Sequence, residues 1–313
     1  MLAFVIHRVL AAVPVLAIVA LLVFLMLRLT PGDPAAVIAG DTATAEDLMR
    51  IRASLGLDRP LAEQLGLWTL RLLQGDLGES FYFKRPVTAL IAQRLEPTLA
   101  LAVCATLLAV LIAIPLGVLA AHRQGSLIDR GVMVFSVLGF SLPVFVIGYL
   151  LIYLLAAELG WFPVQGYARL HEGFGAFLHR IALPSTALAI AYVALIARMT
   201  RASMLEVLGE DYVRTARAKG AATLAVLLHH ALRNAAVPIL TVIGIGVALL
   251  ISGAVVTESV FGIPGLGRLT VEAVLSRDFP TVQALILLFS AVYVLINLAI
   301  DIAYGLLDPR IRY

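Results

Sequence analysis

The chain has 313 residues, of which 61% are hydrophobic and only 14% are charged. Soluble domains are roughly 45–50% apolar and about 25% charged, so most of this chain is expected to lie in lipid rather than in water. One cysteine, Cys104, excludes an internal disulfide framework and any cysteine-based metal cluster. The formal net charge of +3 is small, and in a membrane protein it has to be assigned loop by loop.

Six charge-free apolar runs predict an all-α polytopic membrane protein with six transmembrane helices. An α-helix needs roughly 20 apolar residues to cross the hydrocarbon core, and the runs match that requirement. Because none of them alternates apolar and polar residues, a transmembrane β-barrel is excluded. The fourth run is the shortest, and Pro184 is expected to shorten its helix further. The expected spans are Val9–Leu27, Thr98–Ala121, Gly131–Ala157, Ile181–Ala197, Ala235–Thr257 and Phe279–Ile300.

The first run has two interpretations, because His7 and Arg8 precede it in the way that basic residues precede the core of a cleavable signal peptide. Such a core is about 7–15 residues long, whereas Val9–Leu27 is longer and is followed directly by Arg28. No small-residue cleavage motif stands close behind it. We therefore interpret the run as an uncleaved span.

Six spans place both termini on the same side of the membrane. Cytoplasmic loops carry an excess of lysine and arginine, but loops beyond about 60 residues cross the membrane largely regardless of their charge. When the long first loop, 30–97, is left out, the segments on the side of the termini hold most of the basic residues. We expect a multi-pass protein of the cytoplasmic (inner) membrane, surrounded by lipid, with both termini in the cytoplasm.

The long first loop is predicted to be folded rather than disordered. Capping residues, apolar stripes at helical spacing and glycine or proline stops divide it into three short helices. The helices are expected to start near Thr44 with Asp47, at Pro60 and near Pro86, and to stop at Gly56, at Gly75 and at Glu96–Pro97. Whether they form a cap on the outer membrane face or only a connector that packs on the outer ends of the spans stays open.

Several prolines and glycines are candidates for a pathway that opens and closes. Kinks and small residues let helices change angle and approach closely, although both are common in any membrane bundle. The turn-rich outer segment Phe261–Gly267 either dips toward the mouth of the pathway or forms an ordinary interfacial loop. The candidate pathway residues are Pro143, Gly244, Gly246, Gly253, Pro264 and Gly265.

The sequence contains no recognisable catalytic or cofactor-binding pattern. Neither of the two lysines, Lys84 and Lys219, follows a glycine-rich phosphate-binding loop. The adjacent His229 and His230 would point about 100° apart on a helix, which rules out a shared metal ion. None of the six runs contains an acidic or basic side chain or a histidine, whereas ion-coupled carriers usually need one near the midplane. We expect the chain by itself to have no enzymatic activity and to bind no metal, cofactor or nucleic acid.

The largest cytoplasmic segment, 198–234, carries the most specific pattern. Asp211 stands where an acidic side chain favours the start of a helix, Tyr212–Lys219 follows, and Gly220 suits the position after a helix end. Thr223 is expected to cap a further helix, so that two short helices meet at an angle. The segment is interpreted either as an amphipathic hairpin on anionic lipid or as a plug that docks into a soluble partner.

This segment resembles the "EAA" loop of ABC importer permeases, in the branch that serves peptides and nickel. The resemblance rests on Asp211–Gly220 and Leu227–Asn234, and it extends over nearly the whole chain. Arg214 and Thr215 stand where the motif name expects Glu and Ala, so the contact of that Glu is not transferred to Arg214. In the closing part, Arg233–Pro238 replaces the usual I-x-L-P. The other matching segments are Leu27–Pro34, Gly75–Gly78, Ile114–Val118, Ser141–Pro143, Pro264–Arg268 and Leu307–Tyr313.

The resemblance implies a type I ABC importer permease that pairs with a homologous second permease as a heterodimer. Two cytoplasmic ATPase subunits would use ATP and magnesium, and an extracytoplasmic binding protein would deliver a dipeptide or oligopeptide. A nickel complex or another small solute is the alternative within the branch, and an ion-coupled secondary transporter is the alternative of another class.

The resemblance also implies a division of the chain and a set of coupling residues. The first span and the outer loop would occupy 1–93, the permease core 94–306 and a cytoplasmic tail 307–313. The residues implied to contact an ATPase subunit are Asp211, Tyr212, Arg214, Thr215, Ala216, Arg217, Lys219 and Gly220.

Overall fold

A computed structural model describes residues 2–29, 35, 44–54 and 56–307. These residues form helices joined by loops, and apart from one isolated bridge between Glu79 and Pro86 they contain no β-structure. The predicted all-α class is therefore confirmed. The chain divides into two compact units, of which the first comprises Met1–Ile6, Glu96–Arg268 and Leu295–Tyr313, and the second His7–Leu95 and Leu269–Val294. The division into 1–93, 94–306 and 307–313 stays a prediction, and residues 308–313 lie outside the described part.

Within the described residues, five helices are long and apolar enough to cross a membrane. A sixth candidate consists of two shorter helices that are bent by 103° at a break. The six predicted spans therefore have counterparts in the structure if the bent pair crosses the membrane as one span. The five long helices are α1 (Leu2–Leu29), α5 (Val87–His122), α8 (Phe174–Leu208), the helical stretch that ends in α11 (Arg233–Phe261), and α13 (Phe279–Leu307).

The third span is not the straight helix expected over Gly131–Ala157. Helix α6 (Leu127–Ser141) stops there, and α7 (Val144–Leu151) continues after the bend into the π-helix η1 (Ile152–Glu158). Pro143 lies at the break, and the residue before it is extended, with φ −83° and ψ 128°. Proline has no amide hydrogen and disfavours a helical conformation of the preceding residue, so the sequence at this point forms a corner rather than a mild kink.

Two other prolines do not interrupt their helices, so the predicted effects of both on helix length are wrong. Helix α5 runs through Pro97, where a stop was expected at Glu96–Pro97, and α8 runs through Pro184 without being shortened. Both prolines are buried. A proline inside a helix costs about 3 kcal/mol, which the packing of a long buried helix can outweigh.

The fifth span is the second part of a longer helical stretch. Helix α10 (Thr223–Ala225), the π-helix η3 (Val226–Leu232) and α11 follow one another without a gap. Thr223 is the first helical residue and not the cap, because Ala222 has the extended backbone of an N-cap position. The expected cap at Thr223 is therefore wrong by one position.

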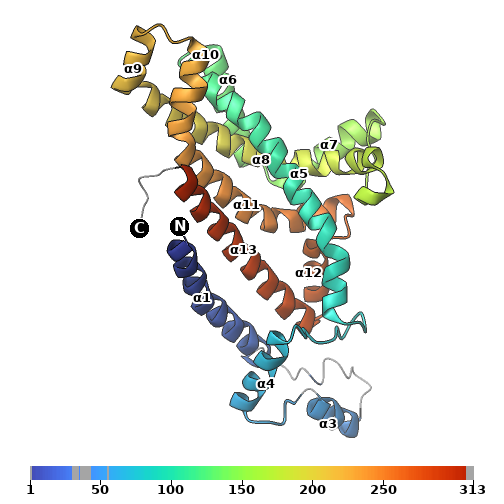
Figure 1. The fold of residues 1–313 in the computed structure, drawn as a ribbon. Helices are drawn as coiled ribbons and strands as arrows, with labels where there is room; N and C mark the ends of the chain where they lie inside the picture. The colour runs from blue at the N-terminus through green and yellow to red at the C-terminus, as the bar shows by residue number, and fades with distance from the viewer. Residues whose placement is uncertain (1, 30–34, 36–43, 55, 308–313) are drawn as a thin grey trace. The chain divides into compact units, whose positions relative to one another are not determined.

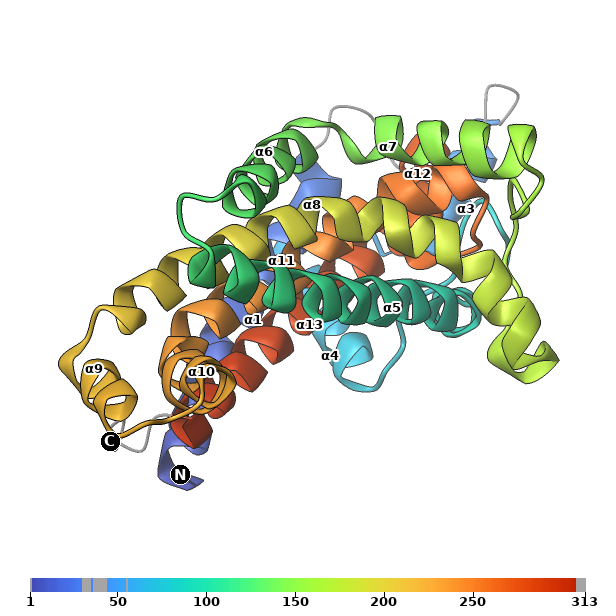
Figure 2. The same ribbon diagram turned by 90° about the horizontal axis from the view of Figure 1, so that it is seen from above.

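The core of the first unit is built around α8. Helices α6, α7 and α11 all pack along it (Figures 1 and 2). Small residues allow the close approach, since a methyl group at Gly139 of α6 would lie only 3.2 Å from the Cβ atom of Ala194 of α8. Buried residues of α8 extend from Phe177 to Met204, so this helix holds the other helices of the unit in place.

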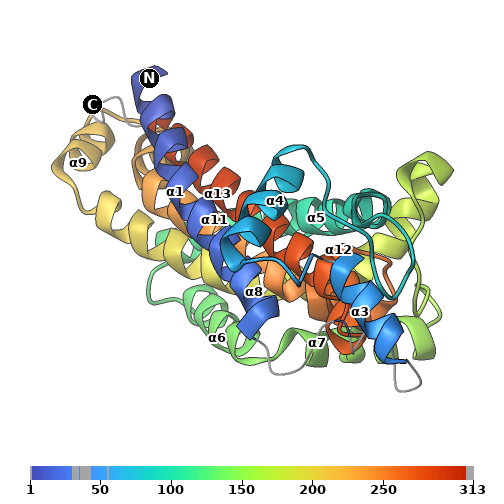
Figure 3. The ribbon, with the colours of Figure 1, turned by 90° about the horizontal axis from the view of Figure 1, so that it is seen from below.

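In the second unit, α4 (Leu61–Leu73) packs against the end of α1 (Figure 3). The rings of Phe24 and Trp68 lie 5.6 Å apart, and Arg28 Nε donates a hydrogen bond of 3.0 Å to Gln64 Oε1. Helix α4 begins after Pro60 and is followed by Gly75 at φ 80°, as predicted. Helix α3 (Ala45–Ser54) also matches its predicted range, and Gly56 follows it at φ 66°. The side chain of Asp47 lies outside the described part of the chain.

A buried carboxylate fastens the first loop to the start of α13 within the second unit. Asp278 is fully buried and accepts hydrogen bonds from Ser80 Oγ (2.6 Å), the Phe81 amide (2.9 Å) and Thr281 Oγ1 (2.6 Å). A buried acceptor of this kind is stabilised only while its donors remain in place. The loop around residue 80 is therefore a fixed part of the unit.

We predict that Asp278→Ala will release this loop. Each buried donor left without an acceptor costs about 1–3 kcal/mol, so tryptic cleavage after the exposed Lys84 should become about tenfold faster in detergent solution. Asp58→Ala, which removes an exposed carboxylate of the same unit, is the control and should leave the rate unchanged. Equal cleavage of the Asp278 variant and the wild type would contradict the role of Asp278.

Candidate functional site

The candidate coupling segment lies at the end of α8 and belongs entirely to the first unit. Helix α8 ends at Leu208, and α9 (Asp211–Ala218) follows after a short turn. The chain then reverses at Gly220 into α10 and η3, against which α9 packs. Figure 2 shows α9 at one end of α8, beside α10.

The limits of α9 follow from its sequence. Glu210 has the extended backbone of an N-cap, and Asp211 places a negative charge at the positive end of the helix dipole. At the other end, the Gly220 amide bonds to the Arg217 carbonyl (2.9 Å) and the Ala221 amide to the Ala216 carbonyl (3.1 Å). This pair of bonds is a Schellman motif, which needs a residue such as glycine at positive φ, here 80°. The helix and its glycine stop are confirmed as predicted.

Two neighbouring side chains attach α9 to the rest of the unit. Val213 is fully buried. The Asn234 amide donates to the Tyr212 hydroxyl oxygen (2.9 Å) and to the His230 carbonyl (2.7 Å). One face of α9 is thereby connected to η3 and to the first turn of α11, so the helix is held in a defined position.

The other faces of α9 are exposed and polar. Thr215 Oγ1 donates to the Asp211 carbonyl (2.9 Å), and Arg214 lies 3.2 Å from the Asp211 carboxylate. Because both partners of this ion pair are largely exposed, it contributes little to stability and leaves both groups accessible to a partner. Arg217 and Lys219 are also exposed. The structure thus brings the predicted coupling residues together on one short helix and the turn that follows it.

The predicted pathway glycines lie at contacts between helices of the first unit. A methyl group at Gly244 would overlap the Ile300 side chain of α13. At Gly246 it would lie 3.1 Å from the Tyr192 ring, and at Gly253 2.9 Å from Leu188, both on α8. These glycines therefore allow α11 to approach its neighbours closely, and their place in a pathway stays a prediction. Pro143 is exposed at the break between α6 and α7.

The segment with Pro264 and Gly265 contains a residue that sequence reasoning missed. Glu258, in the last turn of α11, is fully buried and accepts a hydrogen bond of 2.6 Å from Thr98 Oγ1. The predicted span ended one residue earlier, at Thr257, so this carboxylate received no role. Its signal in the sequence was an acidic residue placed between a charge-free run and a glycine-rich turn.

A second missed contact joins the start of α6 to the last part of α8. Asp129 of α6 is buried, and its carboxylate binds the Arg201 guanidinium of α8 through both oxygens, with an Nη2–Oδ2 distance of 2.8 Å. The Gly125 amide donates to the same carboxylate (2.9 Å). A bidentate arginine pair of this kind fixes orientation as well as distance. No periodic pattern in the sequence connects residues 72 positions apart.

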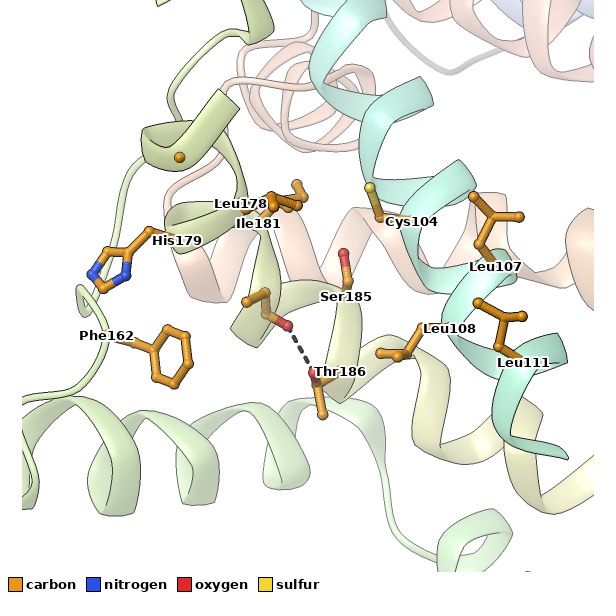
Figure 4. Close-up of a pocket in the computed structure, with 12 residues that line it drawn as sticks. Cys104, Leu107, Leu108, Leu111, Phe162, Leu178, His179, Ile181, Ser185 and Thr186 are labelled. Carbon is orange, nitrogen blue, oxygen red and sulfur yellow. Dashed lines mark hydrogen bonds between the residues drawn. The ribbon is translucent and has the colours of Figure 1, made fainter. Parts of the chain in front are cut away.

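An apolar cavity of about 710 Å³ lies between α5 and α8. Figure 4 shows Phe162 and His179 at one end and Leu107 and Leu111 at the other. The Phe162 and His179 rings are stacked with centroids 5.4 Å apart. Ser185 points its hydroxyl into this region, where it has no hydrogen-bond partner among the described residues. The lining offers few polar groups, so it does not suit the polar backbone of a peptide.

The outer loop before α8 is held by a tyrosine. The Tyr167 hydroxyl donates to Glu96 Oε1 (3.2 Å), and its ring packs edge-on against Phe177. Burial and the nearby Glu96 carboxylate raise the pKa of Tyr167 well above its usual range. In the same loop, the Trp161 side chain is exposed and Phe162 is half-buried.

Within the described residues, the chain has several helices of membrane length, and in the first unit a short polar helix, α9, is held at the end of one loop, as expected for a membrane component of a transporter. Residues 113–313 match the family of binding-protein-dependent transport system inner membrane components, and residues 1–102 match the N-terminal part of such components. The chain belongs to this family. It is a permease subunit of a binding-protein-dependent ABC importer.

Relatives cover the chain from end to end. A probable peptide ABC transporter permease protein of Sinorhizobium fredii is 51% identical over 310 residues, covering 99% of both chains. A putative peptide transport system permease protein of Brucella abortus is 46% identical, and a glutathione transport system permease protein of Pectobacterium atrosepticum is 45% identical, each over 100% of both chains. An inward-facing structure of the MetNI methionine ABC transporter, 20% identical, aligns with a TM-score of 0.58 over 70% of this chain and 96% of its own, which supports the fold alone.

We predict that Val213→Ala will loosen α9 without unfolding the unit. Removing two buried methyl groups weakens the only fully buried side-chain contact described for α9, at a cost of about 1 kcal/mol. Amide hydrogen exchange in 211–218 should then be about fivefold faster, while exchange in α8 is unchanged. Arg217→Ala removes an exposed side chain of the same helix and serves as the control. If α9 exchanges equally fast in both variants, Val213 does not anchor it.

Proposed function

We propose that this chain forms one half of the translocation pathway of an ATP-driven peptide importer. A homologous second permease supplies the other half, two separate ATPase subunits bind ATP and magnesium, and an extracytoplasmic binding protein delivers the substrate. The observation that carries this proposal is α9, a helix with a capped start, a glycine stop and an attached face that exposes Arg214, Thr215 and Arg217.

The attachments of α9 support a mechanical role. A soluble ATPase that closes on ATP and pulls on α9 acts through Val213 and Tyr212 on η3 and the start of α11. Helix α11 packs along α8, so a displacement of α9 passes into the core of the unit. Coupling of this kind requires that the partner contact α9 differently in its two states. An exposed polar helix provides contacts that can change without disturbing the core.

The family narrows the choice of mechanism and of substrate. The alternative prediction of an ion-coupled secondary transporter is wrong, because the relatives are components of ABC transport systems. Relatives named for peptides and for glutathione, which is a tripeptide, favour a small peptide as the imported solute. A nickel complex or another small solute is less favoured by these names. Selection among peptides is expected to lie mainly in the binding protein.

The distribution of basic residues among the loops supports one orientation of the chain in the membrane. The segments that contain α9 and the turn before α6, taken together with the two termini, hold most of the basic residues outside the long first loop. Cytoplasmic segments of membrane proteins carry this excess. Both termini and α9 are therefore assigned to the cytoplasmic side of the inner membrane.

The proposal is tested by co-expressing the chain with a second permease, ATPase subunits and a binding protein from the same organism. Gly220→Pro should reduce the ATPase activity stimulated by peptide-loaded binding protein by about tenfold. Proline cannot adopt the positive φ of Gly220 and has no amide hydrogen to donate to the Arg217 carbonyl, so the end of α9 is lost. Trialanine and glutathione are the probe peptides.

Gly75→Pro is the matched control. Gly75 also has φ 80°, also donates its amide to a helix carbonyl, and also ends a short helix, but it lies in the second unit. Its variant should keep the stimulated activity. Failure of any ATPase subunit to co-purify with the wild type would overturn the importer assembly. A Gly220 variant that responds like the wild type would overturn only the role of α9.

A further inference from the structure

Glu258 is a fully buried carboxylate at the end of the long apolar helix α11. Burial of such a group among apolar residues is costly unless hydrogen bonds replace the lost water. Thr98 Oγ1 of α5 donates to Glu258 Oε1 (2.6 Å), and the Arg268 amide donates to Oε2 (2.9 Å). The carboxylate therefore joins elements that are far apart in the sequence.

The same carboxylate stabilises the start of the next helix. Helix α12 (Leu266–Leu275) has amide groups in its first turn that find no partner within the helix. The Leu266 amide donates to Thr98 Oγ1 (2.7 Å), whose hydrogen in turn is donated to Glu258, and the Arg268 amide reaches Glu258 directly. A negative charge at the positive end of the α12 dipole is favourable. Residues of α5 and α11 thus cap α12 together.

The glycines of the connecting segment make room for this contact. A methyl group at Gly265 would overlap the Glu258 carboxylate, and one at Gly267 would lie 2.5 Å from Val255 Cα and 3.0 Å from Glu258 Oε2. The Ile263 amide bonds to the Glu258 carbonyl (2.9 Å). Both the main chain and the side chain of Glu258 therefore shape the segment that carries Pro264 and Gly265.

Helix α11 connects this contact to the coupling helix. The helical stretch from Thr223 to Phe261 begins beside α9, where Asn234 donates a hydrogen bond to Tyr212. Its last turn contains Glu258. At about 1.5 Å per residue, α11 alone is roughly 40 Å long, which is enough to cross the membrane. One continuous helical stretch therefore contacts α9 at one end and forms the Glu258 contact at the other.

We infer that Glu258 is a positioning residue for transport: together with Thr98 it locks the Pro264–Arg268 segment to α11, so that the segment moves with α11 when α9 is displaced. This inference rests on the proposed function, because it requires α9 to be moved by an ATPase. It assigns the outer end of α11 a task in transport that an ordinary interfacial loop would not have.

The test compares variants of matched shape in the assembled importer. Thr98→Val keeps the volume of the side chain but removes the hydroxyl that binds both Glu258 and Leu266, whereas Thr98→Ser retains that hydroxyl. Glu258→Gln keeps the shape of the other partner and removes its charge. Ser259→Ala, next in the chain, removes an exposed hydroxyl that bonds only to the Val255 carbonyl of its own helix.

Uptake of trialanine and glutathione into proteoliposomes is measured per assembled complex, with the co-purified ATPase as the measure of assembly. Thr98→Val and Glu258→Gln should assemble normally and lower the maximal uptake rate by about tenfold, a barrier change of about 1.4 kcal/mol. The concentration of loaded binding protein at half-maximal rate should stay unchanged, and Thr98→Ser and Ser259→Ala should transport like the wild type.

Normal uptake by assembled Thr98→Val and Glu258→Gln importers would overturn the inference. So would failure of these two variants to assemble while Thr98→Ser assembles, because Glu258 would then serve stability alone. If the wild-type chain itself recruits no ATPase, the proposed function fails instead, and the inference falls with it.

Discussion

A polar group inside the hydrocarbon layer has no water to bind, so the bundle pairs nearly all of those it buries within the protein. Among the described residues, the exceptions are the hydroxyl groups of Ser185 and Thr200. Hydroxyl groups along the helices meet this constraint locally, as Thr241 and Ser290 do by donating to the carbonyl four residues earlier. Larger polar groups lie near helix ends, where Asp129 meets Arg201 and Glu258 meets Thr98. The middle of each long helix carries no charged side chain, and the ends are fastened to their neighbours.

This distribution anchors one long helical stretch at both of its ends. The stretch from Thr223 to Phe261 is anchored to α9 near its start and to α5 and α12 near its end, and α8 supports it in between. The π-helix η3 forms the part that touches α9. Such wide turns are rare and occur frequently at functional sites. Helix α9 thus contacts one continuous helical stretch that leads into the apolar helix α11.

Patterns that depend on neighbouring residues could be predicted from the sequence, including the apolar spans, the start of α9 and the stop at Gly220. Contacts between distant residues could not, because no periodicity connects Asp129 to Arg201 or Thr98 to Glu258. The effects of individual prolines on the helices could not be predicted for the same reason. Pro143 breaks a span and Pro97 does not, and the difference lies in tertiary packing, since Pro97 is buried and Pro143 is exposed.

A crosslink from α9 to an ATPase subunit shows whether this helix contacts the ATPase in the assembled importer. In a Cys104→Ser background, Arg217→Cys on the exposed face of α9 and Lys84→Cys in the first loop are compared with a short bifunctional maleimide in the assembled importer. If α9 contacts the ATPase, the Arg217→Cys variant becomes joined to an ATPase subunit, with a yield that changes when ATP is added, and the Lys84→Cys variant does not. An ATPase that co-purifies but crosslinks to neither position would contradict that contact.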